Sequence, residues 1–184
     1  MEKAALKEHR RHSTADKPFS YYISNIPEYF PNAPMHWHKE FELNVILEGE
    51  GDFVTGDIHF TAYKGDIVLT PPDMLHAVYQ HDDKRCVYDT LDLDGSMLGS
   101  RDNDRAADAF IAPLISGAYS IETHITPEHC YYSELLTTAE NMISAAKGDT
   151  PLLDMLIKSE LLRFMFLLYE SCLLYTSPSP RDRS

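Results

Sequence analysis

The chain has 184 residues, of which 29 are acidic and 16 basic, so its formal net charge is −13. A segment with this surplus of negative charge repels phosphate, which excludes nucleic-acid binding by the segment itself. Its hydrophobic content of 43% is typical of a globular domain, and no apolar run reaches the roughly 18 to 20 residues of a membrane helix. The charged N-terminus lacks the apolar stretch of a signal peptide, so we expect a cytoplasmic protein without a membrane partner.

The first half of the chain is predicted to be rich in β-structure. Residues 1–17 are polar and are expected to form an arm that is disordered or a frayed helix. Residues 18–100 consist of short apolar stretches separated by turn residues, with turns expected at 49–51 and 56–57. The predicted strands span 19–23, 41–47, 52–55, 58–63, 67–70, 76–79 and 86–91. This spacing is typical of an all-β sandwich or barrel.

The second half, residues 101–171, is predicted to be helical. A helical period runs from 104 to 116, where Pro113 must bend or end the helix. Thr126-Pro127 and Thr150-Pro151 are helix-start signals, which predict helices over 127–147 and 151–171. The last helix has more apolar positions than an isolated amphipathic helix needs, so it is buried on two sides or meets a second copy. We favour a homodimer face formed by Leu153, Leu156, Ile157, Leu161, Phe164, Met165 and Leu168.

The C-terminal tail, residues 172–184, is unlike the rest of the chain. Its serine- and proline-rich sequence has the composition of a disordered linker. Residues 172–182 also resemble one translated frame of an adapter used in DNA library preparation. We therefore expect the tail to be an artefact and the natural protein to continue beyond residue 171.

One group of residues has the side chains and the spacing of a metal-binding or ligand-binding site. His36 and His38 are followed by Glu42 and then by a glycine seven positions later, and His76 ends a second segment of the form G-x5-P-x4-H. Three imidazoles and a carboxylate are ligands that one divalent ion such as Zn, Ni, Fe or Mn accepts. On a strand His36 and His38 share a face, and Glu42 keeps that parity unless a bulge substitutes Glu40. Without a metal, the same side chains would line a polar cavity.

Two neighbours of these residues are also candidates for ligand binding. Asn44 shares the polar side of its predicted strand with Glu42, whereas Leu43 and Val45 share the apolar side, which favours a wet pocket on one face and a packed layer on the other. Trp37 could stack on a sugar ring or serve only in packing. The predicted effector-binding set is His36, Trp37, His38, Glu42, Asn44 and His76, and no residue is assigned a catalytic role.

Both segments resemble the paired motifs of the cupin superfamily. The resemblance implies a double-stranded β-helix, or jelly-roll barrel, with metal ligands at His36, His38, Glu42 and His76. The chain departs from the family pattern at Phe30, Asp73 and Gln80, where the family has Gly, Gly and Asn.

Residues 1–171 more narrowly resemble the effector-binding half of AraC-type transcriptional regulators. The resemblance implies a cupin barrel that binds a small polar metabolite, with sugars as one candidate class, followed by an antiparallel helix pair for dimerisation. It also implies a basic helix-turn-helix domain through which the intact protein binds DNA, and nothing in 1–171 resembles that domain. The alternative function is a metal-dependent cupin enzyme, such as a dioxygenase or isomerase.

Overall fold

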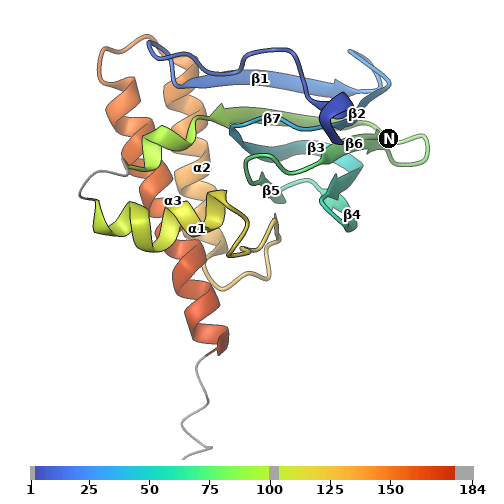
Figure 1. The fold of residues 1–184 in the computed structure, drawn as a ribbon. Coiled ribbons are helices and arrows are strands. Elements are labelled where there is room, and N and C mark those ends of the chain that lie inside the picture. Colours follow the sequence, from blue (N-terminus) through green and yellow to red (C-terminus); the bar gives the residue numbers. More distant parts are fainter. Residues whose placement is uncertain (1–2, 100–103, 177–184) are drawn as a thin grey trace, which may run out of the picture.

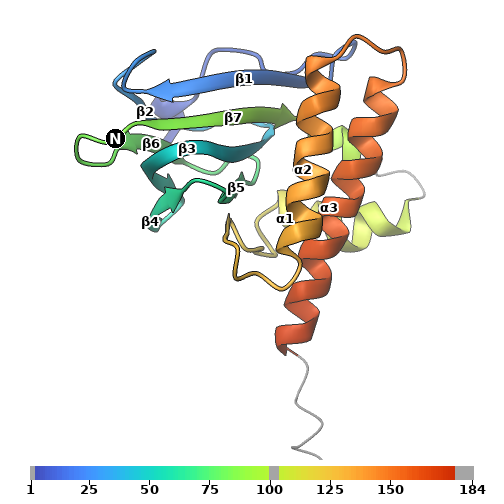
Figure 2. The same cartoon turned by 180° about the vertical axis from the view of Figure 1, so that it is seen from behind.

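The structure, a computed structural model, describes residues 3–99 and 104–176, with side chains up to residue 172. An antiparallel β-barrel forms one side of the molecule, and a pair of long helices packs against its outer surface (Figures 1 and 2). The expected domain boundary at residue 100 and tail residues 177–184 lie outside the described residues. The fold is a mainly antiparallel β-structure with helices, as the sequence predicts.

The strands form two sheets that share one long strand. The first sheet has the order β1-β7-β3-β5-β8, and the second joins β2, β6, β4 and the second half of β3. Each predicted strand has a counterpart, and all pairs are antiparallel. The strands are β1 (Phe19–Ile26), β2 (Asn32–His36), β3 (Phe41–Thr55), β4 (Ile58–Tyr63), β5 (Ile67–Thr70), β6 (His76–Gln80), β7 (Cys86–Leu93) and β8 (His124–Ile125).

The turn predicted at residues 49–51 is wrong, because β3 continues through them. The register against β7 shifts between Ile46 and Glu48, and Gly49 has a φ of 74°. A Cβ at this position would lie 1.7 Å from the carbonyl oxygen of Arg85, so only glycine fits there. The two glycines that suggested a turn instead let one strand bend from the first sheet into the second. The hairpin predicted at 56–57 is confirmed, since Thr55 pairs with Ile58.

The helices follow the barrel in the order predicted. They comprise a π-helical turn over Ala107–Ile111, α1 (Ala112–Ile115), α2 (Tyr132–Lys147) and α3 (Leu153–Thr176). The π-turn precedes Pro113, which lacks an amide donor, and the helix ends two residues after this proline. The start predicted at 127 for α2 is wrong, since residues 127–131 form turns. Within the described residues, no helix is long and apolar enough to cross a membrane.

The last helix differs from the prediction in its end and in its apolar face. Helix α3 runs to Thr176 rather than ending at 171, because residues 172–176 contain neither Gly nor Pro. Of the predicted dimer residues, Leu153 is half-buried and only Leu156 is exposed. The rest fill the core of the protomer and are not available to a partner: Ile157, Leu161, Phe164, Met165 and Leu168. The apolar side chains exposed on and just before α3 are Leu152, Met155, Leu156, Leu162 and Phe166.

Alternation along the central strands creates two separate cores. Leu43 and Val45 of β3 point outward into the core shared with α2 and α3, whereas Ile46 belongs to the core between the two sheets. Along β7, Leu91 and Leu93 likewise join the helical core. The polar residues between them therefore face the barrel interior, as expected for Asn44 and its neighbours.

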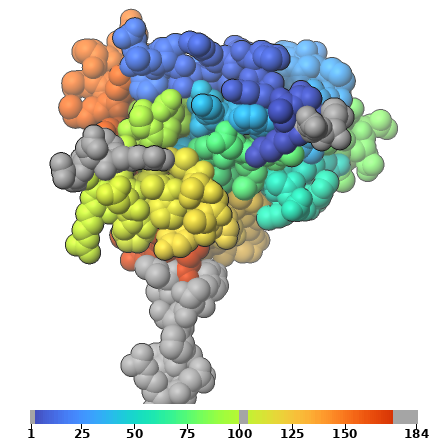
Figure 3. Space-filling model, viewed as in Figure 1, coloured from blue at the N-terminus to red at the C-terminus, as the bar shows by residue number. Residues whose placement is uncertain are grey.

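The N-terminal arm, residues 3–17, docks against the barrel instead of fraying. A short 3₁₀ turn over Lys3–Leu6 precedes a bridge between Lys7 and Trp37. The amide of Glu8 donates to the carbonyl of Trp37 at 2.9 Å, and His12 is buried. In the space-filling view the arm lies as a dark blue band across one face of the barrel (Figure 3).

Candidate functional site

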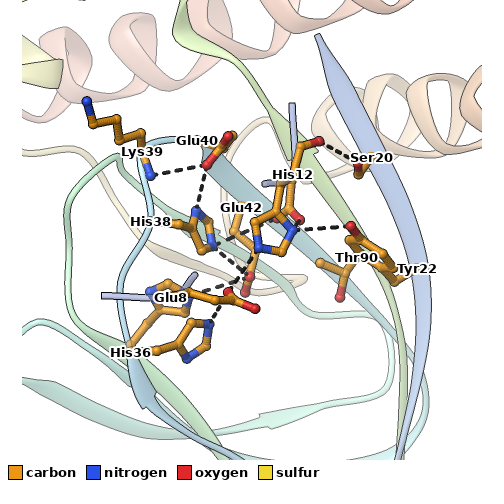
Figure 4. Close-up of polar contacts among 12 residues, drawn as sticks. Glu8, His12, Ser20, Tyr22, His36, His38, Lys39, Glu40, Glu42 and Thr90 are labelled. Carbon is orange, nitrogen blue, oxygen red and sulfur yellow. Dashed lines mark hydrogen bonds and ion pairs between the residues drawn. The ribbon is translucent and has the colours of Figure 1, made fainter. Parts of the chain in front are cut away.

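The four predicted ligands converge inside the barrel. One donor atom from each of His36, His38, Glu42 and His76 can be chosen so that all lie within 4.8 Å of one another. His36 ends β2 and pairs with His76 at the start of β6. The strand parity that related His36, His38 and Glu42 in the sequence does not extend along one strand, because the chain turns a corner at 38–40 as it passes from the second sheet to the first. The corner still directs His38 and Glu42 to the same point (Figure 4).

Backbone carbonyls orient two of the imidazoles. Nδ1 of His36 lies 2.7 Å from the carbonyl oxygen of Pro34, and Nδ1 of His76 lies 2.8 Å from that of Met74. Because a carbonyl only accepts, each Nδ1 carries the proton and donates it. Nε2 of each ring is therefore turned toward the cluster, and the ring centroids are 4.1 Å apart. This is the outer-shell arrangement that metal-binding histidines use.

Glu42, rather than the alternative Glu40, completes the cluster. Its Oε2 lies 3.3 Å from Nε2 of His38 and 3.5 Å from Nε2 of His76. Glu40 stands on the other side of His38, with its Oε2 3.5 Å from Nδ1 of that ring. Asn44 is not part of the pocket wall but donates to Oε1 of Glu42 at 2.7 Å, which fixes the carboxylate.

Charges in the cluster stabilise one another. Burial alone would raise the pKa of Glu42, but the charge of His76 and the hydrogen bond of His38 outweigh burial and hold that pKa well below its ordinary value. Burial opposes protonation of His76, yet the Glu42 carboxylate raises its pKa. Burial and then the charge of His76 lower the pKa of His36, which leaves a neutral imidazole at physiological pH.

The donor set fits a divalent ion. His76 is 3% exposed, and its Nε2 has no hydrogen-bond partner among the described residues. A buried polar atom without a partner requires an explanation, and a cation coordinated by this nitrogen would provide one. Three imidazole nitrogens and one carboxylate oxygen are ligands that borderline divalent metals accept. His36, His38, Glu42 and His76 are the residues that would hold such an ion.

The cluster opens into a cavity of about 310 Å³ between the sheets. Hydroxyl, imidazole and carboxylate groups converge on it, and apolar side chains form the remaining wall. The lining residues are Glu8, Arg10, His12, Tyr22, Ile23, Ser24, Phe30, Ala33, His36, Glu42, His76, Val78, Tyr88, Thr90 and Asp92. A larger groove of about 730 Å³ lies beside α1 but has no histidine in its wall. The smaller cavity is the better candidate site, because its polar groups converge.

Sequence reasoning missed two carboxylates and one imidazole that line this cavity, those of Glu8, Asp92 and His12. His12 lies between two carboxylates, with Nδ1 2.6 Å from Oδ2 of Asp92 and Nε2 2.9 Å from Oε2 of Glu8. Burial opposes its charge, but these two partners raise the pKa of His12 to about 11. Asp92 could have been found by extending the predicted strand 86–91 by one residue. Neither spacing nor periodicity indicated Glu8 or His12.

Trp37 lies outside the cavity wall and contacts the arm. Its indole Nε1 donates to the carbonyl of Lys3 at 2.7 Å, and the ammonium groups of Lys3 and Lys7 lie 5.5 and 5.3 Å from the ring centroid. As the residue between two inward-pointing histidines, it faces the opposite way. The packing interpretation of Trp37 therefore describes its position better than the stacking interpretation.

Comparison with known proteins agrees with this architecture. Residues 17–165 match the family model described as the AraC-like ligand binding domain. The chain belongs to this family. A curated relative, the uncharacterized HTH-type transcriptional regulator YdeC of Bacillus subtilis, is 27% identical over 89 residues, which cover 48% of this chain and 31% of that regulator.

Solved structures similar to this AraC-like ligand binding domain are more distant. A cupin protein from Bacteroides fragilis is 19% identical, with a TM-score of 0.41 and coverage of 45% of this chain and 71% of that one. Bacillus subtilis oxalate decarboxylase, which has Mn(II) centres, is 20% identical, with a TM-score of 0.37 and coverage of 43% and 22%.

Proposed function

We propose that this AraC-like domain senses a small polar molecule, which binds in the barrel cavity of a DNA-binding transcriptional regulator. The observation that carries the proposal is the cavity of about 310 Å³, whose wall combines barrel residues with Glu8, Arg10 and His12 of the arm. A ligand bound there would contact both parts at once. It can therefore favour one arm position over another, which is what an effector must do.

The cavity wall favours a ligand rich in hydroxyl groups. Tyr22, Ser24, Tyr88 and Thr90 supply hydroxyls, and Phe30 supplies an aromatic surface. These groups hydrogen-bond to and pack against a polyol ring, so neutral sugars and sugar acids are the first classes to test.

A thermal-shift screen with monosaccharides, sugar acids and amino acids tests the proposal. Thr90 donates to Asn44 and retains acceptor capacity toward a ligand. Thr90→Val should weaken binding of a hit roughly 5- to 10-fold, the effect of one hydrogen bond of about 1 kcal/mol. Thr138→Val is the matched control, since that buried hydroxyl only donates to the carbonyl of Leu135. A panel without hits, or hits unaffected by Thr90→Val, would contradict effector binding in this cavity.

The proposal extends to the whole protein. The net negative charge of this chain repels phosphate, so DNA would be bound by another part of the regulator, as the name of the Bacillus relative suggests. Homodimerisation would use the exposed apolar side chains of α3, and the protein would act in the cytoplasm.

A metal-dependent cupin enzyme is the second candidate, and the ligand cluster within the cavity favours it. A bound metal would act as a Lewis acid toward an oxygen atom of the small molecule. Elemental analysis of protein purified without a histidine tag tests occupancy, and about one metal per barrel is expected. His76→Ala should then abolish both the metal and any turnover. Absence of metal from the wild-type protein would exclude this candidate.

A further inference from the structure

The N-terminal arm brings a second group of metal-binding side chains beside the first. Donor atoms of Glu8, His12 and His38 also lie within 4.8 Å of one another. His38 belongs to both groups, so the two adjoin. Glu8 and His12 come from the arm, and Figure 4 shows both projecting toward the histidines of the barrel.

Glu8 reaches the first group directly. Its Oε2 lies 3.6 Å from Nε2 of His36, the nitrogen that the Pro34 carbonyl leaves without a proton. The same oxygen accepts from Nε2 of His12 at 2.9 Å, and His12 is in turn held by Asp92 at 2.6 Å. His12 is thus a positioning residue that holds the Glu8 carboxylate at the edge of the cluster.

The backbone fixes Glu8 at this point independently of its side chain. The Glu8 amide donates to the carbonyl of Trp37 at 2.9 Å, and the Trp37 amide donates to the carbonyl of Leu6 at 3.1 Å. The arm is therefore registered against the very segment that carries His36 and His38. This register sets the reach of the carboxylate.

We propose that Glu8 is a further ligand of the divalent cation that His36, His38, Glu42 and His76 would hold, so that the cation fastens the arm over the cavity. The inference rests on the proposed capacity of the barrel to bind a metal. Two carboxylates neutralise a divalent charge, whereas Glu42 alone leaves one positive charge in a buried site. Cation binding and docking of the arm then reinforce each other, since each stabilises the position that the other requires.

Zinc titration of the EDTA-treated, dialysed and tag-free chain tests the inference, with a chromophoric chelator as competitor. Glu8→Gln should weaken zinc affinity about 10- to 100-fold, the range for loss of a group that supports a metal site. Asp16→Asn removes the same charge from an exposed position of the same arm and should leave the affinity within about twofold. Circular dichroism verifies that the variants retain the fold.

The arm itself provides a second readout. Lys7, Arg10 and Arg11 are exposed, so trypsin can cleave the arm whenever it detaches. Zinc should slow this cleavage at least about tenfold in the wild type and in Asp16→Asn, but not in Glu8→Gln. The single tryptophan, Trp37, lies under the arm, and its fluorescence change on zinc binding should likewise differ in Glu8→Gln.

Two results would overturn the inference, and they differ in meaning. Equal zinc affinity and equal protection in Glu8→Gln and the wild type would show that the barrel binds the cation without the arm. No zinc binding by the wild type would refute the cation site as well. Effector sensing is judged separately, by the thermal-shift screen.

Discussion

Phe164 and Phe166 of α3 distinguish the packing of the chain itself from the homodimer proposed above. Phe164 is fully buried, whereas Phe166 is 59% exposed on the face that also carries Met155 and Leu162. Burial of a whole phenylalanine side chain contributes roughly 1.5–3 kcal/mol, so burying the exposed part of Phe166 contributes about 0.9–1.8 kcal/mol. A symmetric dimer formed through this face would bury two copies, about 2–3.5 kcal/mol, so Phe166→Ala should weaken such a dimer about 30- to 300-fold.

Sedimentation equilibrium measures the dimer constant, and urea unfolding at low protein concentration measures the stability of the protomer. Phe166→Ala should change stability by less than about 0.5 kcal/mol. Phe164→Ala should lower the free energy of unfolding by roughly 3–5 kcal/mol, because it leaves a cavity in the core. An unchanged dimer constant in Phe166→Ala would refute this face of α3 as the interface.

Three further outcomes follow from the packing and the titrating groups. Gly49→Ala should destabilise the fold clearly more than Gly117→Ala, because both glycines have a φ of 74° but only a Cβ at position 49 would lie against a carbonyl oxygen. Urea unfolding of the two variants measures the difference. Equal losses in the free energy of unfolding would contradict the clash. Because its pKa is raised to about 11, His12 contributes stability that is complete below about pH 6.5 and is lost as the pH rises toward 11. The difference in the free energy of unfolding between the wild type and His12→Gln, measured in EDTA, should therefore shrink over that range. A constant difference would refute this role of His12. Burial raises the pKa of Cys86 to about 12, so iodoacetamide should modify exposed Cys130 in the folded protein and Cys86 only after unfolding, as peptide mass mapping would detect.

Local patterns predicted the strands because turn residues separate short apolar stretches along the first half of the chain. Alternation placed Leu43 toward a packed layer and Asn44 toward the interior, and the structure has both in those positions. Patterns failed where tertiary packing overrides local chemistry. Gly49 is a residue type typical of turns, but it allows a bend within β3. Thr126-Pro127 is typical of a helix start, but it begins a turn rather than a helix.

The barrel part of the site could be predicted, and the arm part could not. The spacing of His36, His38 and Glu42 is a local signal, and the structure brings these three residues together with His76. Glu8 and His12 belong to a polar segment whose position depends on backbone contacts with Trp37, which lies some thirty residues away in the sequence. The sequence left two explanations for the many apolar residues of α3, burial within the chain or contact with a second copy. Burial against the rest of the chain accounts for most of these residues.

Strand β7 connects the cavity with the helix pair. Its Thr90 and Asp92 line the cavity, while Leu91 and Leu93 on its other face pack in the core with α2 and α3. Asp89 of the same strand accepts from Lys147, the last residue of α2, at 3.0 Å. Because successive side chains on a strand alternate at fixed spacing, a ligand that displaced β7 would also displace the side chains that this strand contributes to the helical core. A ligand in the proposed effector cavity would therefore act on the helix pair through this one strand, which the arm contacts through the ion pair of His12 and Asp92.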